Sequence, residues 1–209
     1  DLGNPPSNST GQSAKAAGST PGPSHEPPTA AAEENPARQV RLRLFAPRLA
    51  IEVGDHEITT GLRSHARLLL ILLVLRRGDG ASTEEITEAL VPNAAPGHAK
   101  PQRNAAVSNL RTTLRTATDR PQAAVVTHTA GRYHLEADAF CADVWAFDDA
   151  LAAARRAPDG ERHRHLAAAM EAYTGPLLSD VAEPWLDPDR PGRRRAAAEA
   201  CVDLAHHAP

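Results

Sequence analysis

The sequence predicts an α+β domain with a small antiparallel sheet, followed by an all-α domain. Three observations indicate this class: a two-residue alternation of apolar side chains, a helical periodicity that replaces it, and an Ala- and Arg-rich C-terminal part. The 209 residues allow one or two domains, since a domain usually takes about 100–200 residues. We place the segment boundaries at 1–37, 38–136 and 137–209.

The first segment, residues 1–37, holds seven Pro, four Gly and five Ser and almost no large apolar residue. Such a composition buries too little apolar surface to offset the entropy of ordering the chain. We therefore expect a disordered linker. Because the chain begins with Asp1 rather than Met, we also expect a further domain upstream of it.

Three short strands are expected at the start of the second segment. Val40–Phe45 reads Val-Arg-Leu-Arg-Leu-Phe, the two-residue period of a half-buried strand. Leu49–Val53 alternates again, and Gly54-Asp55 marks a tight turn before His56–Thr60. Strands so close in sequence predict a small antiparallel sheet.

Two helices follow these strands. Arg63–Arg77 is strongly apolar and is closed by the terminators Gly78 and Gly80. Ser82 with Glu85 three residues later is a capping box, which predicts a short helix that ends near Val91-Pro92. A Pro- and Gly-containing loop is expected over Asn93–Lys100.

A third helix and a hairpin complete the second segment. Gln102–Thr116 carries one buried stripe at helical spacing, made of Ala106, Val107, Leu110 and Leu114. Val125–Thr129 and Arg132–Leu135 predict a hairpin about Ala130-Gly131. Strands, three helices and a hairpin, in this order, predict a winged helix-turn-helix over 38–136.

The third segment predicts helices only. Val144–Arg156 and Glu161–Tyr173 form an antiparallel pair around the breaker at 157–160, and a third helix begins near Arg193. Its aromatic residues are interpreted as core anchors of this segment: Trp145, Phe147, Tyr173 and Trp185.

Charge is distributed unevenly along the chain. The whole sequence has a net charge of −3, but residues 38–136 hold fourteen Lys/Arg against nine Asp/Glu, a net of +5. Residues 137–209 hold eight Arg against thirteen Asp/Glu, a net of −5. A locally basic module attracts a polyphosphate whatever the charge of the whole chain.

The third predicted helix is the candidate for DNA recognition. No acidic residue interrupts it, and its polar side chains are of the types that read base edges and hold phosphates. For base contacts we select Gln102, Arg103, Asn104 and Ser108. For phosphate contacts we select Arg63, Lys100, Arg111 and Arg115, and we expect Arg132 in the hairpin to reach the neighbouring minor groove or the DNA backbone.

Residues 40–209 resemble the SARP-like bacterial transcriptional activators. The matching stretches are Val40–Val53, LRSHARLLLILLVL at Leu62–Leu75, STEEITEALVP at Ser82–Pro92, NAAVSNLRTTLR at Asn104–Arg115, GRYHL at Gly131–Leu135, ADVWAFDDAL at Ala142–Leu151 and AYTGPLLSDV at Ala172–Val181. Their ordered succession is more specific than any one of them. Two departures are Val91, where the family usually has Trp, and a repeat domain that ends after about three helices.

The resemblance implies an OmpR-type winged helix joined to a bacterial transcriptional activator domain of tetratricopeptide-like repeats, here truncated. It implies a cytoplasmic activator that reads promoter repeats in double-stranded DNA with its third helix, with RNA polymerase as a partner. The repeat domain would serve dimerisation, ligand sensing or partner contact, which leaves a homodimer open.

Catalysis, metal binding and membrane insertion have little support in the sequence. No phosphate-binding loop, nucleophile elbow or kinase motif is present, so we expect neither an enzyme nor a cofactor. His163 and His165 are two residues apart, whereas helical metal ligands sit three or four apart. The longest aliphatic run, Leu68–Leu75, is too short to span a bilayer. We therefore expect no metal site and no membrane contact from this segment.

The cysteines and the function each allow two interpretations. Cys141 and Cys201 are interpreted as free thiols in a reducing compartment, although a disulfide between them is compatible with the sequence. The alternative function is a protein-interaction scaffold whose winged helix no longer binds DNA. Two features support this alternative: the linker at the start of the chain, and a +5 charge of residues 38–136 that is modest for a strong DNA binder.

Overall fold

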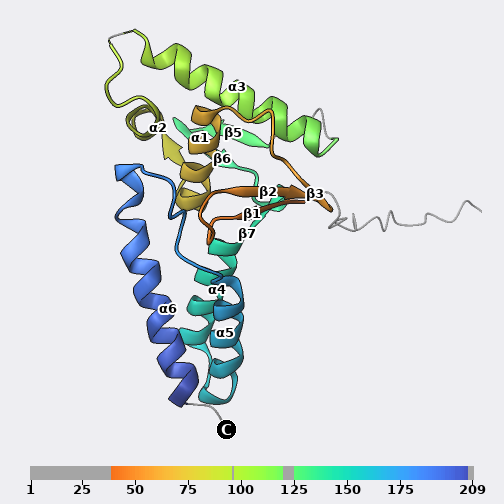
Figure 1. The fold of residues 1–209 in the computed structure, drawn as a ribbon, viewed down its shortest axis with the longest axis vertical. Coiled ribbons are helices and arrows are strands. Elements are labelled where there is room, and N and C mark those ends of the chain that lie inside the picture. Colours follow the sequence, from red (N-terminus) through yellow and green to blue (C-terminus); the bar gives the residue numbers. More distant parts are fainter. Residues whose placement is uncertain (1–38, 96, 120–124, 207–209) are drawn as a thin grey trace, which may run out of the picture. The chain divides into compact units, whose positions relative to one another are not determined.

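The computed structural model describes residues 39–95, 97–119 and 125–206 (Figure 1). The predicted linker at 1–37 lies outside the described residues. All described residues belong to one structural unit. The domain boundary predicted at residue 137 therefore stays a prediction.

The first sheet has four strands in the order β3-β2-β1-β7 (Figure 1). In β1 (Val40–Arg43), buried Val40 and Leu42 alternate with exposed arginines. Strand β1 pairs antiparallel with β2 (Ala50–Val53), and β2 pairs antiparallel with β3 (His56–Glu57). The fourth strand, β7 (Phe140–Ala142), runs parallel to β1. The three predicted strands pair antiparallel as predicted, but the parallel β7 makes the sheet mixed. Strand β7 was not predicted, because three residues are too few to show a strand period.

Helix α1 (Ser64–Arg76) is the central element of the core. Its six consecutive residues from Leu69 to Val74 are all buried, so the helix has no solvent-facing side along this stretch. It leads through the short 3-10 helix η2 (Arg77–Asp79) to Gly80, which has φ +63°. A side-chain carbon at this glycine would lie 2.5 Å from His134 and 2.6 Å from the backbone oxygen of Tyr133. Gly80 is therefore required both for its backbone conformation and for its space.

Helix α2 (Thr83–Leu90) confirms the predicted capping box. The Glu85 N–H donates to Ser82 Oγ at 3.1 Å, and the Ser82 N–H donates to a Glu85 carboxylate oxygen at 2.8 Å. Helix α3 (Ala99–Ala117) begins three residues before the predicted start at Gln102. Pro101 is compatible with this earlier start, since the first turn of a helix has no backbone partner for its N–H groups.

The predicted hairpin is formed by β5 (Val126–Thr129) and β6 (Arg132–Leu135). Both turn residues, Ala130 and Gly131, have positive φ, as two-residue hairpin turns require. A two-residue strand, β4 (Ala81–Ser82), pairs with β6 and was not predicted. The resulting sheet, in the order β4-β6-β5, joins the hairpin to the start of α2.

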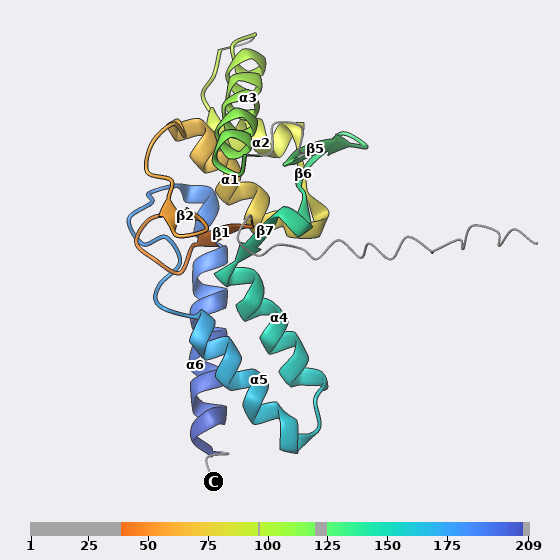
Figure 2. The same cartoon turned by 90° about the vertical axis from the view of Figure 1, so that its right-hand side faces the viewer.

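The C-terminal part holds α4 (Asp143–Arg156), α5 (Asp159–Ala172) and α6 (Asp189–His206), with short 3-10 helices at Ala137–Ala139 and Pro184–Leu186. Figure 2 shows α4 and α5 packed side by side as the predicted antiparallel pair, and α6 against α5. Helix α6 begins four residues before the predicted start at Arg193.

Three of the predicted core anchors pack on the winged helix. The ring centroid of Phe45 lies 5.3 Å from that of Phe147 and 4.7 Å from that of Tyr173. The indole N–H of Trp145 donates to the backbone oxygen of Val74 in α1 at 2.8 Å. The aromatic side chains therefore bind the helical part to the winged helix rather than forming a separate core.

Several sequence expectations concern absences. Among the described residues, no helix combines the length and the apolar character that crossing a membrane requires. The same residues contain no group of three or more His, Cys, Asp or Glu arranged for a metal ion. Cys141 is half-buried, Cys201 is exposed, and both are free thiols.

Candidate nucleic-acid interface

Helix α3 has one buried and one exposed side. Its buried stripe is the predicted one (Ala106, Val107, Leu110 and Leu114), and it packs on α1 and α2. The remaining positions are half-buried or exposed. We define the outer face of α3 by its exposed residues: Lys100, Pro101, Gln102, Asn104, Ala105, Ser108, Thr112 and Thr116. Nothing in the described structure, the acidic helices α4–α6 included, covers this face.

Arg103 does not belong to the outer face. It precedes Ala106 and Val107 by three and four residues, so helical geometry places it on the buried side. Its side chain is half-buried, with Nη1 donating to Thr87 Oγ1 at 3.3 Å and Nε buried without a hydrogen-bond partner among the described residues. The structure thus places Arg103 beside the buried stripe and not on the outer face, and its contact with a base stays a prediction.

Arg132 is held by the protein itself. Its Nε donates to the Asp79 backbone oxygen at 2.7 Å, and its Nη2 donates to the Gly80 oxygen at 2.9 Å and to Glu85 at 3.0 Å. These contacts fix β6 of the hairpin to the start of α2. Arg132 thus has a positioning role within the protein, and its predicted reach to a minor groove or DNA backbone stays a prediction.

Glu85 links three elements through its carboxylate. The Ser82 N–H lowers the pKa of Glu85, and the nearby guanidinium groups of Arg132 and Arg76 lower it further. Arg76 also approaches Asp189 at the start of α6, with 3.9 Å between Nη1 and the carboxylate. The capping box of α2 is thus connected electrostatically to the hairpin and to the helical part.

The charge of Glu85 should stabilise the fold in a pH-dependent way. Because its folded-state pKa is lowered, the stabilisation is present above the ordinary carboxyl pKa and is lost as pH falls through the lowered value. We expect Glu85→Gln, which keeps the capping hydrogen bonds, to lower the free energy of unfolding at pH 7 by about 0.5 kcal/mol after solvent screening. Urea unfolding at several pH values measures this, with exposed Glu88→Gln as control. A difference that persists well below the carboxyl range would contradict the assignment.

A pocket lies between α3 and the hairpin. It is about 360 Å³ in volume and is lined by Asn104, Val107, Ser108, Arg111, Thr112, Arg115 and Tyr133. The Arg111 Nε donates to the backbone oxygen of Val126 in β5 at 3.0 Å, so its guanidinium is held at the pocket wall. Arg111 and Arg115 therefore make this side of the outer face cationic.

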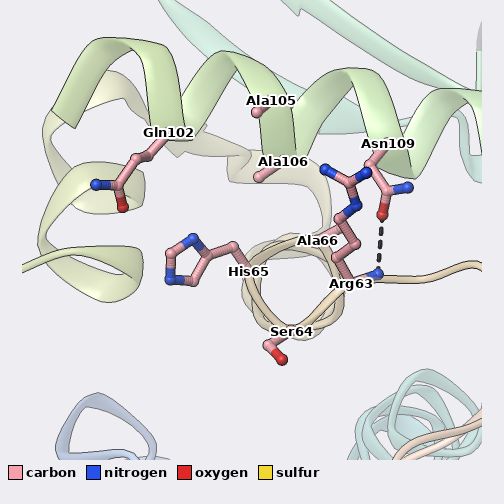
Figure 3. Close-up of a pocket in the computed structure, with 8 residues that line it drawn as sticks. All are labelled: Arg63, Ser64, His65, Ala66, Gln102, Ala105, Ala106 and Asn109. Atoms are coloured by element: carbon pink, nitrogen blue, oxygen red, sulfur yellow. Dashed lines mark hydrogen bonds between the residues drawn. The ribbon is translucent and has the colours of Figure 1, made fainter. Parts of the chain in front are cut away.

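A second pocket lies on the other side of α3, against the start of α1. It is about 470 Å³ in volume and is lined by Arg63, Ser64, His65 and Ala66 of the α1 side and by Gln102, Ala105, Ala106 and Asn109 of α3. Figure 3 shows Arg63 and His65 extending toward α3, whereas Ser64 points away from it. Arg63 is exposed there. The outer face of α3 thus has a cation-bearing pocket on each side.

Asn109 has a structural role in this second pocket. Its Oδ1 accepts the backbone N–H of Arg63 at 2.9 Å, and its Nδ2 donates to the Gly61 oxygen at 3.0 Å (Figure 3 shows the first of these bonds). Thr113 Oγ1 also donates to the Gly61 oxygen, at 3.2 Å. These bonds fix the start of α1 against α3, and hence the position of Arg63.

The structure brings together most of the predicted interface. Gln102, Asn104, Ser108 and Lys100 lie on the outer face, and Arg63, Arg111 and Arg115 lie beside it. Sequence reasoning left out Ala105 and Thr112. The spacing 104, 108, 112 was the available signal, since residues four apart share one side of a helix. DNA binding by these residues stays a prediction.

Comparisons with known proteins support the fold. No family model matches the chain, and no curated protein sequence matches it. One similar solved structure is Mycobacterium tuberculosis EmbR in complex with a low-affinity phosphopeptide, with a TM-score of 0.54 and 22% sequence identity over 81% of this chain. The chain spans 43% of the length of EmbR. At this identity the match shows a shared fold, consistent with a winged helix followed by helices.

Proposed function

We propose that this chain is a sequence-specific double-stranded DNA-binding regulator of transcription that inserts α3 into the major groove. The observation that carries the proposal is the outer face of α3: it is exposed, contains no carboxylate and has cationic side chains along both sides. A regulator of this fold would act as an activator through RNA polymerase, as the family resemblance implies.

An exposed helix such as α3 fits into the major groove of DNA. The groove is about 12 Å wide and admits one α-helix with its side chains. Side chains at the centre of the helix then face base edges, whereas those at its margins face the two phosphate backbones. Asn104, Ser108 and Thr112 occupy the centre of α3, and the arginines line its margins.

The rest of the winged helix positions α3 for this contact. The bonds of Asn109 place Arg63 beside one margin, and the Arg111 bond to Val126 keeps a guanidinium beside the other. Arg132 and Glu85 fix the hairpin to α2. A rigid support of this kind lowers the entropy lost when the cations meet phosphates.

Binding of the whole 209-residue chain to duplex DNA tests the proposal. The probe is a pool of random-sequence 30-bp duplexes, and retention is measured by gel shift at about 50 mM and 200 mM salt. We expect retention that weakens strongly with salt, since phosphate contacts release counterions. Absence of any duplex retention at the lower salt would contradict the proposal and favour the scaffold function.

One phosphate contact can be tested separately. We expect Lys100→Gln to flatten the slope of log affinity against log salt by about one unit, because one counterion fewer is released. Base preference should not change. The matched control is Arg195→Gln, which removes one exposed charge from α6. An unchanged slope in Lys100→Gln, or an equal change in the control, would remove Lys100 from the interface.

A further inference from the structure

The centre of the outer face carries no charge. Asn104, Ser108 and Thr112 are four residues apart and form one exposed row, with exposed Ala105 beside it. Within the described part of the chain, the three polar side chains of this row make no hydrogen bond. An amide, two hydroxyl groups and two methyl groups (of Ala105 and Thr112) are therefore what α3 presents at its centre.

The guanidinium groups near α3 lie beside this row or away from it, and two of them line the same pocket as Asn104, Ser108 and Thr112. Arg103 is turned to the buried side and contacts Thr87. Arg111 is held at the hairpin side by Val126, and Arg115 lines the same pocket. Arg63 lies in the pocket on the opposite side. The guanidinium groups, which are well suited to guanine, thus lie beside the central row rather than in it.

Each base pair selects a different side chain in the major groove. Guanine is read mainly by Arg or Lys through its O6 and N7 atoms. Adenine is read by an Asn or Gln amide through N6 and N7, and the thymine 5-methyl group is read by apolar contact with Ala or a Thr methyl. The central row has the amide and the methyl groups that read adenine and thymine. It has no Arg or Lys side chain to read guanine.

We propose that the central row recognises A·T base pairs, with Asn104 bonding adenine N6 and N7 and the methyl groups of Ala105 and Thr112 contacting thymine 5-methyl groups. This inference rests on the proposed function and specifies its base preference. Cations at the margins then supply affinity without base selection, and the uncharged centre supplies the selection.

Selection from the random duplex pool with the 209-residue chain tests the preference. We expect the enriched site to contain an A·T step whose base pairs are the most sensitive to mutation. Asn104→Ala should weaken binding to the enriched site about 5- to 100-fold and relax the preference at one adenine, with little loss on unselected duplexes. The matched control is Asn93→Ala, an exposed asparagine in the loop before α3.

Modified bases then test the two contacts directly. Deoxyuridine in place of thymidine removes only the 5-methyl group, and 7-deazaadenine in place of adenine removes only the N7 acceptor. Each modified base should weaken binding of the wild-type chain several-fold. Asn104→Ala should be insensitive to 7-deazaadenine but should keep its sensitivity to deoxyuridine.

The outcomes separate this inference from the proposed function. Salt-sensitive binding to an enriched site dominated by G·C pairs, or binding unaffected by both modified bases, overturns the A·T preference but leaves DNA binding in place. Failure to retain any duplex overturns both.

Discussion

Ser108→Glu should reduce the affinity for duplex DNA by at least about 100-fold and leave the fold unchanged. Ser108 lies at the centre of the outer face and is exposed, so a carboxylate there meets the electronegative groove between two rows of phosphates. Like-charge contact inside an interface costs several kcal/mol. An exposed helical substitution away from the core changes the free energy of unfolding by less than about 0.5 kcal/mol. Fluorescence anisotropy with a labelled duplex measures the affinity, and urea unfolding measures the stability.

The matched control for this change is Ala198→Glu. Ala198 is exposed on α6, so the variant has the same net charge as Ser108→Glu and differs only in the position of the carboxylate. We expect its affinity to stay within about twofold of wild type, because charges farther than a Debye length of about 8 Å are screened. Equal losses in the two variants would show that net charge, and not the outer face, governs binding.

We expect Asp143→Ala to lower the free energy of unfolding more than substitution of other polar residues does. The carboxyl oxygens of Asp143 accept the backbone N–H groups of Leu44, Phe45 and Val144 at 2.7–2.9 Å. All three donors belong to buried residues, and a buried donor without an acceptor costs about 1–3 kcal/mol. We therefore expect the free energy of unfolding to fall by about 3 kcal/mol, measured by urea denaturation.

Asp143 acts at the junction of β7, α4 and the end of β1. The same end of β1 is also held by Thr174 Oγ1, which donates to the Phe45 oxygen at 2.7 Å, and by the Leu178 N–H, which donates to the Leu44 oxygen at 3.0 Å. Asp138→Ala, an exposed change just before β7, is the control and should be neutral. A loss of less than about 1 kcal/mol in Asp143→Ala would show that water replaces the carboxyl group.

The helices of the winged helix could be predicted from the sequence because their signals are local. The capping box of Ser82 and Glu85 and the apolar stripe of α3 each lie within a few turns of chain, and both are confirmed. Strands β4 and β7 could not be predicted, since strands of two and three residues show no period and their partners β6 and β1 are far away in the sequence. The parallel pairing of β7 with β1 brings together residues about 100 positions apart.

The sequence predicts which helix carries the candidate site, but it does not predict the contacts of every side chain there. Helical spacing alone would have placed Arg103 on the buried side with Ala106 and Leu110, and would have added Thr112 to the outer face. The contacts of Arg132 depend on backbone oxygens of Asp79 and Gly80, which no sequence pattern reveals. Such long-range contacts to backbone groups become visible only when the fold is known.

Photo-crosslinking from the outer face of α3 tests the central claim most directly. A benzophenone amino acid replaces Ser108 in one variant and Ala198 in a second, and each is irradiated with a duplex that the wild-type chain retains. We expect an adduct from position 108, weakened at high salt, and none from position 198. A duplex that is retained but crosslinks only from position 198, or from neither position, would contradict the claim.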